Sequence, residues 1–231
     1  QNQDYYRIEP LKGDALLAVV CDGMGGAKAG NVASRLACEV FTEEVSRSFR
    51  PDQTPKELQA MLRGAAALAN TSVFEHSKLS EEFTGMGTTL VAVMVRGRKA
   101  TIVNVGDSRA YHFSRKSGEL RQVTRDHSLV QSMVDRGLIT EDEARSHPRK
   151  NVIMRAVGLE RTIRSDIFRL DIRPGDALLL CSDGLSNLVD AGEMESLLLA
   201  SSDDDAVCRE LLRMALDRGA PDNVTLALVR R

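Results

Sequence analysis

Two short apolar runs in the chain each lead into an aspartate followed by glycine. Residues 16–21 (LLAVVC) form a continuous apolar run of strand length that stops at Asp22, and residues 177–180 (ALLL) lead into a turn that carries Asp183. Glycine-rich segments such as the one after Asp22 interrupt regular structure, because glycine adopts backbone conformations that other residues avoid. The pattern predicts two buried strands, each presenting an aspartate to a turn.

Apolar residues recur at helical spacing in several longer segments. One such segment opens at Thr54, a residue type that often caps a helix, and Pro55 suits the first helical position. The predicted helices cover residues 31–49, 54–79, 129–136, 193–200 and 205–218.

Strand-like runs with Gly, Pro or Asp between them fill most of the remaining chain. Residues 88–95, 100–105 and 109–113 predict a meander, and residues 166–172 and 224–229 predict further strands. The polar stretch up to about residue 149 has no apolar period and is interpreted as surface structure. Consecutive strands with paired helices between them favour an α+β class of packed antiparallel sheets covered by helices.

Composition narrows the choice of function. The chain has 231 residues, 42% of them hydrophobic, which suits one large domain spanning residues 1–231. Its 31 basic and 33 acidic residues nearly cancel, and the chain has no basic run, which disfavours a nucleic-acid partner.

No apolar span or signal peptide is present, so we expect a soluble protein with no membrane partner, although the chain opens at Gln1 rather than Met. The four dispersed cysteines are typical of buried free thiols in a reducing compartment.

Asp22, Asp183 and Asp222 each lie where an apolar strand meets a Gly or Pro turn, and Asp107 follows Gly106 at the end of another strand. Carboxylates that converge at strand ends repel one another unless a cation neutralises them. Oxygen ligands select Mg²⁺ or Mn²⁺, whereas the four His and four Cys show no paired zinc-ligand spacing. Two such ions can activate water and stabilise an in-line displacement at phosphorus.

A structural interpretation exists for each aspartate alone, because Asp before Gly is a common turn residue. For Asp107 the Gly-Asp-Ser-Arg segment is equally compatible with a hairpin turn. Other phosphate chemistries fit worse: Ala27 and Asn187 stand six positions after Cys21 and Cys181, where a cysteine phosphatase needs Arg. The glycine-rich loop also lacks the Lys-Ser/Thr ending of a P-loop.

Taken together, the motifs resemble the metal-dependent protein phosphatases of type 2C, and in particular their bacterial housekeeping members. The resemblance runs over almost the whole chain. Its motifs are NQD at 2–4, DGMGG at 22–26 with AG at 29–30, GMGTT at 85–89, GDSRAY at 106–111, TRDHS at 124–128, SDGL at 182–185 and PDN at 221–223.

The resemblance implies a four-layer α-β-β-α sandwich with a flap subdomain at roughly residues 128–160. It implies that Asp22 bridges two Mn²⁺ or Mg²⁺ ions, that Gly23 gives its carbonyl, and that Asp183 and Asp222 complete the shell. Asp107 with Asp183 would hold a third, weaker ion. Asp4 and Asn223 would support the site from outside the metal shell, and Arg149 and Arg155 in the flap are candidates to meet the substrate.

Several positions depart from the family pattern. Met24 stands where some members carry a His proposed as general acid, so a metal-bound water or another group would protonate the leaving oxygen. Ala27 and Asn31 replace a His and a Glu that are common in bacterial relatives. A phosphate-binding Arg five residues before Asp4 would precede Gln1. Either native residues precede Gln1, which the missing Met favours, or this protein binds phosphate less tightly.

The function expected from the resemblance is hydrolysis of phosphoserine and phosphothreonine in proteins by direct attack of metal-activated water. Expected partners are phosphorylated proteins, including a cognate Ser/Thr kinase and its substrates, for a monomeric cytoplasmic enzyme. One alternative is a pseudophosphatase that binds phosphoproteins without cleaving them, which loss of a metal aspartate would favour. Another is a phosphatase devoted to a single regulatory phosphoprotein.

Overall fold

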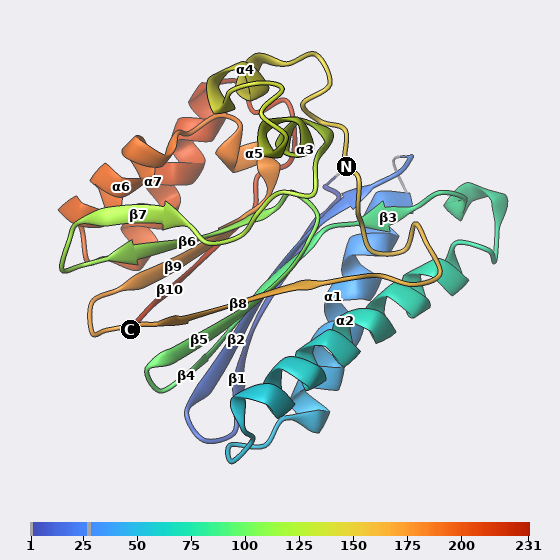
Figure 1. Cartoon of the computed structure of the whole chain (residues 1–231), viewed down its shortest axis with the longest axis horizontal. Helices are drawn as coiled ribbons and strands as arrows, with labels where there is room; N and C mark the ends of the chain where they lie inside the picture. The colour runs from blue at the N-terminus through green and yellow to red at the C-terminus, as the bar shows by residue number, and fades with distance from the viewer. Residues whose placement is uncertain (1, 27–28) are drawn as a thin grey trace.

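Two antiparallel sheets stacked face to face form the centre of the molecule, with a pair of long helices on each outer face (Figure 1). The computed structural model describes residues 2–26 and 29–231, so Gln1 and Ala27 lie outside the described residues. The larger sheet has the order β1-β2-β4-β5-β8 with β3 paired to β2, and the smaller has the order β10-β9-β6-β7. This arrangement confirms the predicted α+β sandwich.

The strands of the larger sheet are β1 (Asp4–Leu11), β2 (Ala15–Met24), β3 (Gly87–Thr88), β4 (Leu90–Arg96), β5 (Lys99–Val105) and β8 (Asp166–Asp171). Those of the smaller sheet are β6 (Arg109–Ser114), β7 (Glu119–Gln122), β9 (Ala177–Cys181) and β10 (Leu226–Arg230). The long helices are α1 (Ala29–Ser48) and α2 (Pro55–His76) on one side and α6 (Ala191–Ala200) and α7 (Asp204–Asp217) on the other. Shorter helices are η1 (Glu81–Phe83), α3 (Leu129–Asp135), α4 (Glu141–Ser146) and α5 (Asp183–Ser186).

Burial on both faces explains why the central strands show continuous apolar runs. In β2, Leu17 and Val19 pack toward α1 and α2, whereas Ala18 and Val20 pack between the sheets. Successive side chains of a strand point to opposite faces, so a strand between two apolar layers needs apolar residues at every position. β9 follows the same rule, and both strands therefore end where the apolar layers end.

Helix ends agree with the predicted capping chemistry. The hydroxyl of Thr54 accepts a hydrogen bond from the Glu57 amide, and the Glu57 carboxylate accepts one from the Thr54 amide. Pro55 occupies the first turn, where an amide hydrogen is not needed. α2 ends at His76, three residues earlier than predicted, because residues 77–79 form a turn.

The prediction of one continuous meander was wrong for residues 109–113. β4 and β5 pair in the larger sheet, but β6 pairs with β9 in the smaller one. Gly106 has φ of +109°, a conformation that suits glycine, and the chain crosses from one sheet to the other there. The hairpin interpretation of the Gly106–Arg109 segment is therefore wrong as well.

The prediction missed β1 and α4 as well as the short elements η1, β7 and α5. β1 is an edge strand whose residues are all exposed or half-buried, so it lacks the continuous apolar run that marks β2. α4 was missed because it lacks an apolar stripe, although Thr140 and Glu143 form a capping box that marks its start.

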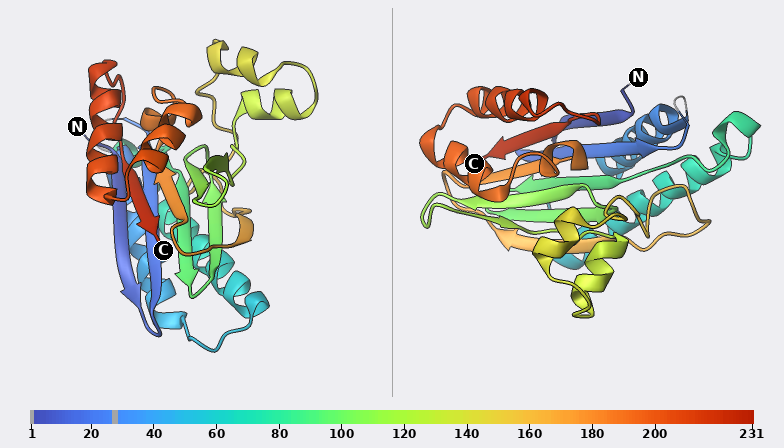
Figure 2. Two further views of the ribbon diagram at one scale, coloured as in Figure 1. Left: turned by 90° about the vertical axis from the view of Figure 1, so that its left-hand side faces the viewer. Right: turned by 90° about the horizontal axis from the view of Figure 1, so that it is seen from above.

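Residues 128–160, assigned to a flap from the sequence, contain α3, α4 and a long loop. Figure 2 shows α3 and α4 standing away from the two sheets at one end of the molecule. Isolated bridges between Ser128 and Ile153 and between Thr88 and Val157 attach the segment to its own base and to the larger sheet.

The four cysteines are free; Cys21, Cys38 and Cys181 are buried and Cys208 is half-buried. This matches the predicted state of the thiols. Among the residues that the structure describes, no helix has the length and apolar character needed to cross a membrane.

The capping box of α2 generates a prediction about stability. Thr54→Ala removes the side-chain acceptor of the Glu57 amide and should lower the free energy of unfolding by about 1 kcal/mol. Denaturant unfolding followed by circular dichroism measures the change. Thr71→Ala, in the middle of the same helix on its exposed side, is the control and should cost less; equal losses would contradict the assignment of the cap.

Candidate functional site

Carboxyl groups from both sheets gather at the end of the sandwich below α3 and α5. Asp22 is near the end of β2, directly opposite Asp4 of β1 in the strand register. Asp183 follows β9, Asp222 precedes β10, and Asp107 lies in the crossing from β5 to β6. The structure therefore brings together the aspartates that the sequence singled out, and places Asp4 among them.

Hydrogen bonds hold Asp4 between the two sheets. The hydroxyl of Ser182 donates to Asp4 Oδ2 at 2.8 Å, and the same hydroxyl accepts the Thr225 amide at 3.0 Å. Nearby, the Gln3 amide donates to Asn223 Oδ1 at 2.7 Å. Asn223 thus connects the segment that carries Asp222 to the segment that carries Asp4.

Two glycines permit backbone contacts that any side chain would block. A Cβ on Gly23 would lie 2.1 Å from the carbonyl oxygen of Gly30, and a Cβ on Gly184 would lie 2.0 Å from the carbonyl oxygen of Asn223. Both distances are far below van der Waals contact. The glycines following Asp22 and Asp183 therefore serve close packing of the segments around the site.

Thr89 links Asp22 to the loop that carries Asp107. Its hydroxyl accepts the Asp22 amide at 2.9 Å and lies 2.7 Å from the hydroxyl of Ser108. The Thr89 amide in turn donates to the Asp22 carbonyl at 2.8 Å. Because Thr89 and Ser108 are fully buried, these bonds fix the backbone at both aspartates.

Burial and mutual repulsion disfavour the ionised form of the carboxyl groups in this cluster. Burial, and then the carboxylates of Asp4, Asp183, Asp107 and Asp222, raise the pKa of Asp22 to about 10. Burial, followed by the charges of Asp183 and Asp126, raises the pKa of Asp107 to about 7. Burial likewise raises the pKa values of Asp4 and Asp183. Without a cation, the folded chain therefore holds protons here at neutral pH.

The chemistry of these donors fits a hard divalent cation. All the converging side chains are carboxylates, and a cation would offset the repulsion that raises their pKa values. Within residues 2–26 and 29–231, no three His, Cys, Asp or Glu side chains form a ready-made metal-holding group. The type of these donors matches Mn²⁺ or Mg²⁺ better than zinc.

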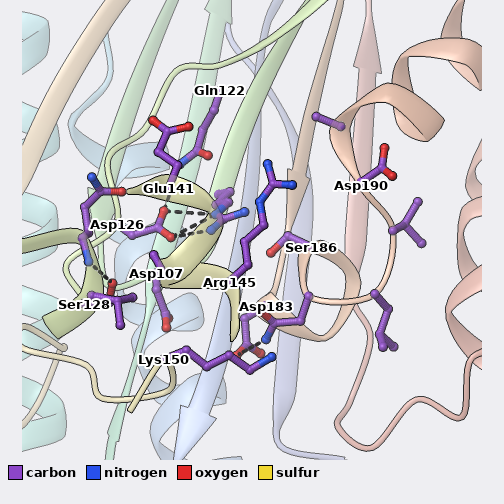
Figure 3. A pocket seen from close by; sticks show the side chains of 18 of the residues that line it. Asp107, Gln122, Asp126, Ser128, Glu141, Arg145, Lys150, Asp183, Ser186 and Asp190 are labelled. Carbon is purple, nitrogen blue, oxygen red and sulfur yellow. Dashed lines mark hydrogen bonds and ion pairs between the residues drawn. The ribbon is translucent and has the colours of Figure 1, made fainter. Parts of the chain in front are cut away.

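A cavity of about 430 Å³ opens beside the cluster, between the segment containing α3 and α4 and the start of α6. Asp107 and Asp183 line its inner end, and Asp190 and Arg218 line its outer part. Figure 3 shows Lys150 extending toward Asp183 and Arg145 pointing into the same space.

The two predicted substrate-binding arginines lie elsewhere. Arg155 donates to Asp166 and to the carbonyl of Arg164, and Arg149 is exposed; neither is among the residues described around this cavity. Lys150 and Arg145, which the sequence analysis did not single out, are the flap cations that line it. Arg145 lies in α4 and Lys150 in the turn that follows it, so whether they face the cavity depends on tertiary structure, and sequence alone gave no signal for them.

The raised pKa of Asp22 generates a prediction about stability without metal. An aspartate has a pKa of about 3.9 when unfolded and Asp22 about 10 when folded, so its contribution is fully present below pH 4 and is lost as pH rises toward 10. In chelator, the Tm should fall between pH 5 and pH 8. Asp22→Asn should reduce this fall and exceed the wild-type Tm at pH 8 by at least about 4 °C.

Differential scanning fluorimetry in chelator across this pH range measures the effect. Asp52→Asn, at an exposed aspartate outside the cluster, is the control and should follow the wild-type curve. A Tm difference between wild type and Asp22→Asn that does not grow with pH would contradict the account.

Comparison with known proteins identifies the family. The protein phosphatase 2C family model matches residues 1–223. The serine/threonine phosphatase stp of Listeria welshimeri is 36% identical over 230 residues, covering 100% of this chain and 90% of that protein.

Solved structures agree in fold. The serine/threonine phosphatase Stp1 of Staphylococcus aureus has a TM-score of 0.92 at 33% identity, covering 100% of this chain and 89% of that one. The catalytic domain of the phosphatase PstP, in complex with two manganese ions, has a TM-score of 0.84 at 33% identity, covering 99% of this chain and 90% of that one. The chain belongs to the protein phosphatase 2C family.

Proposed function

We propose that this protein is a metal-dependent phosphatase that hydrolyses phosphoserine and phosphothreonine in proteins. The observation that carries the proposal is the convergence of Asp22, Asp183, Asp222 and Asp107 beside a cavity. Carboxylates at this density are stable as anions only with a cation, and the family relatives are Ser/Thr phosphatases.

In this proposal Asp22, the carbonyl of Gly23, Asp183 and Asp222 would hold two Mn²⁺ or Mg²⁺ ions. Asp107 and Asp183 would hold a third, weaker ion. The manganese-bound structure of PstP supports the choice of cation. The bound ions supply Lewis acidity, which neutralises charge on the phosphoryl oxygens and activates water as a nucleophile.

The surrounding residues keep the ligands in place. Ser182 donates to Asp4 and so orients a carboxylate that faces the cluster from outside the shell. Asn223 holds the Asp222 segment against Gln3. Met24 has no proton to donate, so the leaving Ser or Thr oxygen must receive its proton from another group.

The cavity beside Asp107 and Asp183 gives the residues flanking the phosphorylated side chain a place to bind. Its volume of about 430 Å³ is within the usual range for ligand sites. Lys150 and Arg145 on the flap side place positive charge where an anionic substrate would approach.

The expected substrates are phosphorylated proteins, including a cognate Ser/Thr kinase and the proteins that it modifies. A monomeric cytoplasmic enzyme that forms one domain with a flap at about 128–160 remains our expectation. The free thiols support a reducing compartment.

The proposal predicts metal-dependent release of phosphate from a phosphothreonine peptide. Activity should appear with Mn²⁺, vanish with chelator, and fall at least about 100-fold in Asp183→Asn, because a metal that stabilises transition-state charge by several kcal/mol loses a ligand. Asp52→Asn, at an exposed aspartate outside both the cluster and the cavity, is the control and should retain activity within a few fold. No activity with any divalent ion would sink the proposal and favour a pseudophosphatase.

A further inference from the structure

His127 lies at the point where the smaller sheet leads into the flap segment, and its side chain is 8% exposed. In the sequence it is the fourth residue of the TRDHS motif at 124–128. Its backbone amide donates to the carbonyl of Gly106 at 2.9 Å, and its Nδ1 accepts the amide of Gly106 at 3.0 Å. One residue therefore satisfies both backbone polar groups of the glycine that precedes Asp107.

Gly106 needs this support. It is buried, has φ of +109°, and a Cβ there would lie 2.6 Å from Thr89. The side chain of Asn104 also donates to the Gly106 carbonyl, at 3.3 Å, whereas His127 Nδ1 is the acceptor found for the Gly106 amide within the described residues. A buried amide without an acceptor costs about 1–3 kcal/mol, so losing Nδ1 would favour movement of this loop.

The other ring nitrogen faces the start of β8. Because Nδ1 accepts, the proton of the neutral ring is on Nε2, which donates to Asp166 Oδ2 at 3.1 Å. Arg155 Nη1 lies 2.8 Å from Nε2 and 3.2 Å from Asp166 Oδ1. Since the first of these distances joins two donors, the carboxylate of Asp166 is the partner of the guanidinium.

The same residue also holds the far end of the flap segment. The Met154 amide donates to the carbonyl of His127 at 2.7 Å, and Arg155 follows directly in sequence. The loop that carries Asp107 and the returning segment of the flap are thus both attached to His127, through its side chain and its backbone.

We propose that His127 is a positioning residue that fixes Asp107 through Gly106 and couples it, through Asp166 and Arg155, to the flap. The inference rests on the proposed function, because it assigns Asp107 to the weaker ion site. It predicts that the geometry of this site depends on Nδ1, while the contact with the flap depends on Nε2.

Two conservative substitutions separate these roles. In His127→Asn the side-chain oxygen can take the place of Nδ1 and accept the Gly106 amide, but the side chain is too short to reach Asp166. In His127→Gln the amide nitrogen can reach Asp166, but no acceptor remains for Gly106. His112→Asn is the matched control, because half-buried His112 of β6 places its Nε2 3.1 Å from buried Asp176, next to β9, in another His–Asp pair.

The first measurement is a titration of Mn²⁺ binding. Electron paramagnetic resonance detects the free ion. His127→Gln should weaken the weakest site about tenfold or more, the size typical when a residue supporting a metal ligand is lost. His127→Asn and His112→Asn should bind Mn²⁺ within about threefold of wild type. Thermal unfolding in chelator verifies that each variant is folded.

Steady-state kinetics provide the second measurement. His127→Asn should raise KM for a phosphothreonine peptide while leaving hydrolysis of p-nitrophenyl phosphate, which has no flanking residues, nearly unchanged. His127→Gln should lower kcat for both substrates at limiting Mn²⁺, with rescue at high Mn²⁺.

A folded His127→Gln variant with wild-type Mn²⁺ binding would overturn the inference, as would equal weakening in His112→Asn. A wild-type protein that binds no third ion would overturn it too. Failure of the proposed function is distinguishable, because then the wild-type protein itself would release no phosphate from either substrate with Mn²⁺.

Discussion

Repulsion among buried carboxyl groups is the interaction on which the functional end of this protein depends. Asp22 has carboxyl neighbours from both sheets, and burial together with their charges raises its pKa to about 10. A folded protein keeps such a cluster only at a cost in stability, and a divalent cation removes that cost by neutralising the charge. The same cation supplies the chemistry of phosphate hydrolysis, so the strain in the cluster and the proposed activity have one origin.

The rest of the sandwich holds the repelling groups in place. β2 and β9 are buried on both faces, which fixes the positions at which Asp22 and Asp183 emerge. Ser182 joins Asp4 to Thr225, and Thr89 joins Asp22 to Ser108, so hydrogen bonds connect ligand segments from both sheets. Rigid support of this kind is what a site needs if its geometry is to survive the electrostatic repulsion.

Much of this organisation was predictable from local pattern. Continuous apolar runs ending at Asp22 and Asp183 identified buried strands and their turns, and the resemblance to the family placed Asp4 at the site before the structure did. The crossing at Gly106 was not predictable from periodicity, because a strand looks the same whichever sheet it joins. The roles of Lys150 and Arg155 depend on how the flap loop folds back on the rest of the molecule, and no local pattern of the sequence predicts the direction of these side chains.

If Asp22 bridges two divalent ions held jointly with Asp183 and Asp222, crystals grown with Mn²⁺ should reveal both ions when measured at a wavelength where manganese scatters anomalously. We expect two strong anomalous peaks roughly 3.5–4 Å apart, both within ligand distance of the Asp22 carboxylate. A single peak away from Asp22, or none in this cluster at saturating Mn²⁺, would contradict the bridging role of Asp22.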